Sequence, residues 1–128
     1  MFKKILLSAV FAASTLATAQ IDLDLNLTIS HEEAQQQATG SVVVAEDEET
    51  SVVFDGLESL VIDFVTHLED GIVTIQAQFL QRMEDEELLA IADLLVAQTQ
   101  LGEAATFTIS EEDGSGELVL VVVPSLVQ

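Results

Sequence analysis

The chain contains no cysteine, tryptophan or tyrosine, and its only lysines are Lys3 and Lys4. Without cysteine it cannot form disulfide bonds, so the fold must be held by buried apolar surface. Cysteine and tyrosine, absent from the chain, and lysine, absent after Lys4, are also side chains that commonly serve in nucleophilic and acid–base catalysis. We therefore expect no catalytic activity.

Basic residues are scarce along the whole chain. The 128 residues include three Lys or Arg and 23 Asp or Glu, a formal net charge of −20 at pH 7. Residues 20–128 keep only Arg82 against all 23 acids, a formal charge of −22. Such a surface repels nucleic acid and anionic lipid. Apolar residues make up 49% of the chain, which argues against intrinsic disorder.

The N-terminal segment has the pattern of a signal peptide. Two lysines precede an apolar run over residues 5–13, and Ala17-Thr18-Ala19 resembles a cleavage site. The run is shorter than the roughly 20 residues of a spanning helix, so we expect no transmembrane segment after cleavage. The prediction is a signal peptide over residues 1–19, one domain over 20–128, and a periplasmic or extracellular location in a bacterium.

Residues 59–82 predict one long β-hairpin. Asp70-Gly71 lies between two apolar runs and is a strong type I′ turn signal, because both central positions of that turn need a positive φ. With these two residues as the loop, the apolar side chains gather on one face. The predicted pairs on that face are Leu68–Val73, Thr66–Ile75, Phe64–Ala77 and Ile62–Phe79, and those on the other are His67–Thr74, Val65–Gln76, Asp63–Gln78 and Val61–Leu80.

The segments before this hairpin also favour β structure. Residues 20–30 alternate between apolar and polar side chains, which predicts a half-buried strand. The Gln-rich stretch 31–40 predicts a loop, with room for one helical turn. Residues 41–45 and 51–54 are rich in β-branched side chains, and we expect them to form a small hairpin whose acidic tip is 46–49.

The signals conflict after Arg82. Four acids over 84–87 suit a helix N-terminus, and the following leucines and alanines favour a helix to about Asp93. We expect at most one short helix, near 84–93. Residues 94–100 are equally compatible with a strand.

The last segment predicts a second long hairpin. Residues 105–109 alternate, Asp113-Gly114 marks a turn, and 118–123 return as a strand that is apolar on both faces. This register pairs Ile109 with Leu118, Phe107 with Leu120 and Ala105 with Val122, and Pro124 is expected to end the strand. An apolar return strand indicates a central or covered position. The fold class is mainly β, an antiparallel β-sandwich or small open barrel of about seven strands.

Part of the C-terminal half resembles a known family. Residues 99–109, T-Q-L-G-E-A-A-T-F-T-I, resemble the T-x-x-G-x-x-A-x-F/I-x-I/V signature of the secretin domain in outer-membrane channels of bacterial type II and III secretion. Residues 119–126 and 72–81 are similar to neighbouring strands of that domain. The resemblance implies an exported β-rich module and a strand over 94–100. It does not extend to a full secretin, so we do not carry over a pore function.

The two histidines do not predict a catalytic or zinc site. Asp63 and His67 share a face of the central hairpin but are about 13 Å apart, too far for a direct hydrogen bond. His31 lies beside Glu32 and Glu33 in the predicted loop. Zinc sites need three or four ligands, and catalytic serines need a flanking motif that is absent here.

The acidic clusters are better candidates for Ca²⁺ than for any other cofactor, because carboxylate oxygens in loops suit that ion. None matches the EF-hand spacing. Glu111, Glu112 and Asp113 come nearest, so they are the candidate Ca²⁺ ligands. The competing interpretation is solvated turns that discourage edge-to-edge aggregation.

These observations predict an exported, non-catalytic interaction or structural module of the cell envelope. Its expected partner is a protein that is basic or that adds a strand to a sheet edge. A Ca²⁺-dependent acidic surface module and a small hydrolase are the alternatives. Arg82 either contacts an anion or a partner protein, or it forms a local ion pair or packs its aliphatic stem along the strand end.

Overall fold

The computed structural model describes residues 19–110, 114 and 116–127, which form two antiparallel β-sheets and contain no helix. The predicted mainly β fold is confirmed, with nine strands in the described residues rather than about seven. The strands are β2 (Gln20–His31), β3 (Ala34–Ala45), β4 (Thr50–Phe54), β5 (Leu57–Glu69), β6 (Ile72–Arg82), β7 (Leu88–Ala90), β8 (Leu95–Gln100), β9 (Ala105–Ser110) and β10 (Gly116–Leu126).

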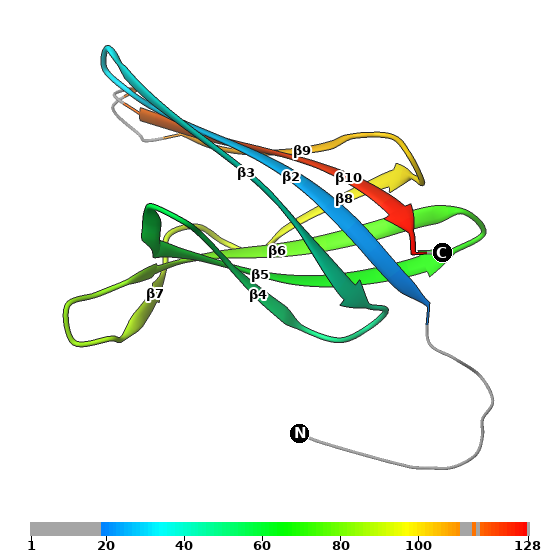
Figure 1. Cartoon of the computed structure of the whole chain (residues 1–128). Helices are drawn as coiled ribbons and strands as arrows, with labels where there is room; N and C mark the ends of the chain where they lie inside the picture. The colour runs from blue at the N-terminus through cyan, green and yellow to red at the C-terminus, as the bar shows by residue number, and fades with distance from the viewer. Residues whose placement is uncertain (1–18, 111–113, 115, 128) are drawn as a thin grey trace.

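The two sheets pack face to face as a sandwich (Figure 1). The first has the strand order β3-β2-β10-β9. The second has the order β4-β5-β6, and both β7 and β8 pair with β6. The chain passes between the sheets at the β3–β4 and β8–β9 connections. No helix in the described residues could span a membrane, and residues 1–18 of the predicted signal peptide lie outside them.

The central hairpin is confirmed, including its register. β5 and β6 pair Leu68 with Val73 and continue without a slip to Leu60 and Gln81, so every predicted pair is present. Asp70 and Gly71 have φ values of 54° and 78°, as a type I′ turn requires. The inward side chains are buried, which explains why only this register is stable.

The C-terminal hairpin also has the predicted register, and β10 is central between β2 and β9. The prediction that Pro124 ends the strand is wrong, since β10 continues to Leu126 and Pro124 lies opposite Leu23. The Pro124 carbonyl accepts a hydrogen bond from the Gly102 N–H at 2.7 Å, on the side away from β2. The Pro124 nitrogen, which has no hydrogen to donate, is on the same side as its carbonyl, beyond the end of β9. The hydrogen bonds between β10 and β2 are therefore intact.

Two predictions for the N-terminal half are wrong. Residues 34–40 are not a loop but the first part of β3, because pairing with β2 satisfies their backbone even though most of the side chains are exposed. Residues 41–45 and 51–54 do not form a hairpin. The first pairs with β2 and the second with β5, and the acidic stretch 46–49 crosses from one sheet to the other.

The helix expected near 84–93 is also wrong. β7 is a short strand, and β8 over 95–100 agrees with the strand alternative. The Ile91 N–H donates to the Phe79 carbonyl at 3.0 Å, and the Gln78 side chain donates to the Ala92 carbonyl at 2.9 Å. Pairing with the open side of β6 thus overrides local helix propensity, which is a weak preference.

The core lies between the sheets and contains inward side chains from both. Phe79 on β6 and Phe107 on β9 face each other across it, with ring centroids 6.5 Å apart. Val61 is buried too, but on the outer face of the second sheet, where it lies opposite Val53 and Leu80. The largest fully buried side chains are Phe64, Phe79, Ile21, Leu23, Leu27, Ile62, Ile75, Leu120, Val44, Val73, Val122 and Thr66.

Candidate functional site

The core opens into a cleft at one end of the sandwich. Along β2 the inward side chains are buried as far as Leu27, but Ile29, the next on that face, is only partly buried. Ile109 continues the inward row of β9 in the same way beyond Phe107. The first sheet therefore presents apolar side chains that the second sheet does not fully cover.

The second sheet leaves this end open because its edge strand is interrupted. Residues 91–94 separate β7 from β8, and Ile91 and Ala92 from this segment face Ile29, Ile109 and Leu118. The resulting cavity has a volume of about 930 Å³. We call it the end cleft, and its lining residues are Ile29, Ser30, His31, Gln81, Ile91, Ala92, Ile109, Ser110, Gly116, Glu117 and Leu118.

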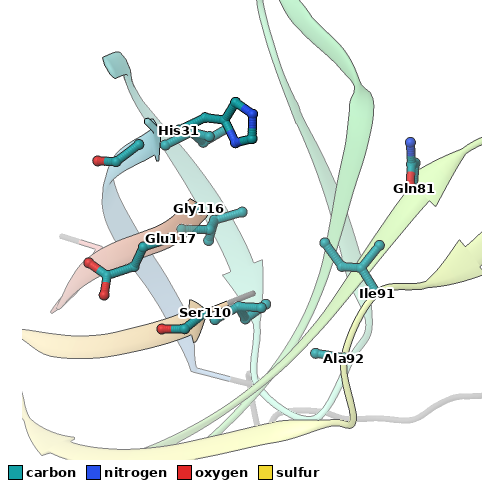
Figure 2. Close-up of a pocket in the computed structure, with 11 residues that line it drawn as sticks. His31, Gln81, Ile91, Ala92, Ser110, Gly116 and Glu117 are labelled. Atoms are coloured by element: carbon teal, nitrogen blue, oxygen red, sulfur yellow. The ribbon is translucent and has the colours of Figure 1, made fainter. Parts of the chain in front are cut away.

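Polar side chains stand at the mouth of the end cleft rather than on its floor. Figure 2 shows Ile91 and Ala92 on one side of the space and His31 and Gly116 on the other. Glu117, next along β10, points away from the cavity. The polar side chains on the inward faces of the strands at the end cleft are the imidazole of His31 and the amide of Gln81. A cavity that combines apolar side chains with inward polar groups can serve as a binding site.

The charged groups around the end cleft are mostly acidic. Glu32 and Glu33 form the β2–β3 turn directly after His31, and the exposed acids 84–87 lie in the β6–β7 connection, which follows Gln81 and Arg82. Arg82 is the one basic residue of the described part of the chain, and its Nε lies 3.6 Å from Glu86 Oε2. Arg82 thus forms the local ion pair that was one of its predicted roles, and this end keeps a strong negative charge.

A second cluster of ionisable groups lies on the edge of β5, at the other end of the sandwich. His67 Nδ1 is 3.1 Å from Asp47 Oδ1 and 3.3 Å from Glu46 Oε2. The same Glu46 oxygen accepts the Leu68 N–H at 3.0 Å, and the Asp47 N–H donates to the Thr66 carbonyl at 2.7 Å. Since β4 covers β5 only as far as Phe64, these bonds extend the hydrogen bonding along the edge of β5.

The side chains of Glu46, Asp47 and His67 could each offer a ligand atom to a metal ion, because these atoms lie within 4.8 Å of one another. Their present hydrogen bonds give them a structural role that needs no ion. No serine or threonine hydroxyl is hydrogen-bonded to His67 in the described residues, and Asp63 is bonded to Ser51 instead. The cluster therefore lacks the nucleophile that a hydrolase of the Ser-His-Asp type requires.

The sequence did not predict this cluster. Asp47 and His67 are 20 residues apart, and they meet only because residues 46–49 cross between the sheets. The hydrogen bond to Asp47, together with the charges of Asp47, Glu46 and Glu69, raises the pKa of His67 above its usual value despite a smaller opposing effect of desolvation.

The raised pKa of His67 gives a pH-dependent contribution to stability. A histidine whose pKa is higher in the folded state stabilises it fully below the unfolded pKa of about 6.5 and loses that contribution as pH rises through the folded pKa. The difference in unfolding free energy between the wild type and His67→Gln should therefore be larger at acidic than at alkaline pH.

Urea denaturation followed by circular dichroism at several pH values measures this difference. The effect should be modest, because the His67 side chain is half exposed and solvent screens the pair. In an Asp47→Asn background the same difference should vary much less with pH. A difference that is independent of pH, or that grows as pH rises, would contradict the proposed ion pair.

Glu111, Glu112 and Asp113, the candidate Ca²⁺ ligands, lie outside the described residues. His31 does not lie in a loop as expected but ends β2 and lines the mouth of the end cleft. The end cleft itself carries no sequence signal, because it depends on the irregular segment 91–94, most of which propensity assigned to the end of a helix over 84–93.

Comparisons of the chain with protein-family models, with curated proteins and with solved structures find no match.

Proposed function

We propose that this chain is an exported, non-catalytic binding module of the cell envelope, whose end cleft takes apolar side chains from a basic partner protein. The observation that carries the proposal is the end cleft, an open cavity of about 930 Å³ whose lining combines aliphatic side chains with a smaller polar part and which has acidic residues nearby. Export rests on the signal-peptide pattern of residues 1–19.

The floor of the end cleft selects apolar groups. Ile29, Ile91, Ile109 and Leu118 expose carbon atoms that would leave water when a ligand enters. Burying apolar surface gains about 25 cal/mol per Å², so one or two inserted aliphatic side chains supply useful affinity. His31 and Gln81 at the mouth can hydrogen-bond to the partner's backbone.

The charge around the end cleft favours a partner of opposite, positive charge. The acids near the cleft are Glu32, Glu33 and residues 84–87. Arg82 is the only basic residue in the described part of the chain, and it is already paired with Glu86. Opposite charge on a partner speeds its approach and rejects acidic competitors. A basic segment with alternating aliphatic side chains therefore satisfies both requirements.

A synthetic peptide of alternating leucine and lysine is a direct probe of the end cleft. We expect it to bind the chain with one-to-one stoichiometry by isothermal titration calorimetry, and Ile91→Ser to weaken binding about five- to tenfold by removing part of the floor. Ile91 is 39% exposed, so the variant should fold normally. Val96→Ser is the matched control, since Val96 is 57% exposed on β8 and does not line the cleft.

Two further peptides separate shape from charge. A lysine–serine peptide should bind much more weakly, because it cannot fill the apolar floor. A leucine–glutamate peptide should also bind weakly, because the acids repel it. Equal binding of the lysine–serine peptide, or no difference between Ile91→Ser and Val96→Ser, would show that the acidic surface attracts cations without using the cleft.

A further inference from the structure

The edge strand β3 lacks the features that normally protect a sheet edge. Its 12 residues, Ala34–Ala45, contain no charged residue and no proline, and they pair with β2 without a bulge. Edge strands usually carry such features because an open edge can pair with another chain. Residues 34–45 are also the longest uncharged stretch of residues 20–128, in a chain with 23 acids.

The other sheet edges are better protected. β4 has five residues and a bulge at Val53/Phe54, and β9 has six residues. On the far side of the second sheet, residues 91–94 interrupt the edge between β7 and β8. Among the described strands, β3 is therefore the one long, regular and neutral edge (Figure 1).

The hairpin register shows which backbone groups of β3 are free. His31 and Ala34 flank a two-residue turn, so they form a hydrogen-bonded pair and alternate residues from Ala34 onward face β2. The bond from the Glu46 N–H to the Ala19 carbonyl at 2.9 Å follows the same alternation. The N–H and C=O groups that face away from β2, with no hydrogen bond to any described residue, belong to Gln35, Gln37, Thr39, Ser41 and Val43.

We propose that β3 pairs antiparallel with β3 of a second copy of this chain about a two-fold axis at Thr39, which joins two four-stranded sheets into one of eight strands. A two-fold axis makes the same edge complementary to itself, so each outward N–H meets a C=O of the other copy. Thr39 then lies opposite Thr39 of the second copy, and Gln37 opposite Ser41.

Charge identifies a second copy, rather than a basic partner, as the occupant of this edge. A basic strand would find no carboxylate on β3, because every side chain of Ala34–Ala45 is uncharged. The neutral strand that matches β3 in length and in polarity is β3 itself. Within the strands of this sheet, the nearest acids, Asp22 and Asp24, are on β2, one strand away from the proposed contact. Glu33 and Glu46 flank β3 at its two ends, outside the pairing of Gln35 to Val43.

Sedimentation velocity of the purified chain at physiological salt tests the proposal. We expect the fraction of dimer to rise with protein concentration in the micromolar range. No species larger than a dimer should form, since a two-fold contact closes on itself. Thr39→Pro removes an outward N–H, and Gln37→Glu with Ser41→Glu places like charges opposite each other, so both variants should be monomeric. Gln76→Glu with Gln100→Glu adds the same charge on the second sheet and should remain dimeric.

Cross-linking tests the register independently, because the chain has no cysteine of its own. Residues opposite each other in a hydrogen-bonded pair have Cα atoms about 5.5 Å apart, within the range of a disulfide. Thr39→Cys should therefore form an oxidised dimer in nearly full yield. Val43→Cys should not, since the two copies of residue 43 would be about 27 Å apart.

Several results would overturn the proposal. A chain that stays monomeric throughout the concentration range has no such contact. A dimer that survives both Thr39→Pro and the double glutamate variant uses another surface, and growth beyond a dimer contradicts a closed two-fold pair. Circular dichroism of each variant establishes that a loss of dimer is not a loss of fold.

Discussion

Replacing Phe79 with alanine is expected to lower the free energy of unfolding by about 3–5 kcal/mol. Phe79 is fully buried on β6, and its ring faces that of Phe107 on β9, in the other sheet. Truncation removes the apolar contacts, leaves a cavity and breaks an aromatic pair that joins the two sheets. A domain of this size has a total stability of about 5–15 kcal/mol, so the loss is a large part of it.

Urea denaturation followed by far-ultraviolet circular dichroism measures this loss, since the chain has no tryptophan or tyrosine for fluorescence. The midpoint should fall and the slope should stay constant if the variant remains two-state. Val96→Ala, at an exposed position of β8, should change the stability by no more than about 0.5 kcal/mol. A Phe79→Ala loss below about 1 kcal/mol would contradict the packing of the sheets on this pair.

Leu27→Ala and Ile29→Ala should differ strongly, although both remove three carbon atoms from the same face of β2. Leu27 is fully buried between the sheets, and we expect its truncation to cost about 3 kcal/mol. Ile29 is partly buried at the end cleft, and its truncation should cost about 1 kcal/mol because less contact is lost. The difference locates the end of the core and the beginning of the cleft.

The same urea measurement on both variants makes the comparison. Ile29→Ala should also lower the affinity of the chain for the leucine–lysine peptide, since Ile29 belongs to the floor of the end cleft. Equal losses of stability at the two positions would mean that Ile29 is packed as tightly as Leu27. The space between the sheets would then be filled core rather than a binding site.

The two hairpins show which features of the fold can be predicted from local sequence. Asp70-Gly71 specified the turn, and the alternation of apolar side chains on each side of it specified the register from Leu60 to Gln81. The same reasoning paired Ala105 with Val122 and predicted β10 as a central strand. Both hairpins join neighbouring segments, so the information that determines them lies within a few residues of the turn.

Strand partners across longer distances were decided by the tertiary structure. Residues 41–45 could have paired with 51–54, but β2 offered them a longer partner with a buried face. Residues 88–100 had helix propensity in their first half, yet the unpaired side of β6 drew them into the second sheet. In each case long-range hydrogen bonding and burial outweighed a local preference of a few tenths of a kcal/mol per residue.

The sequence alone thus determined the β class, the strong negative charge of residues 20–128, and the two hairpin registers. Only the tertiary structure brought His67 to Asp47, gathered Ile29, Ile91 and Leu118 around the end cleft, and left β3 as an open edge. The reason is that periodicity records which side of a strand faces the core, whereas the choice of neighbouring strand depends on which backbone edges remain unpaired when the whole chain has folded.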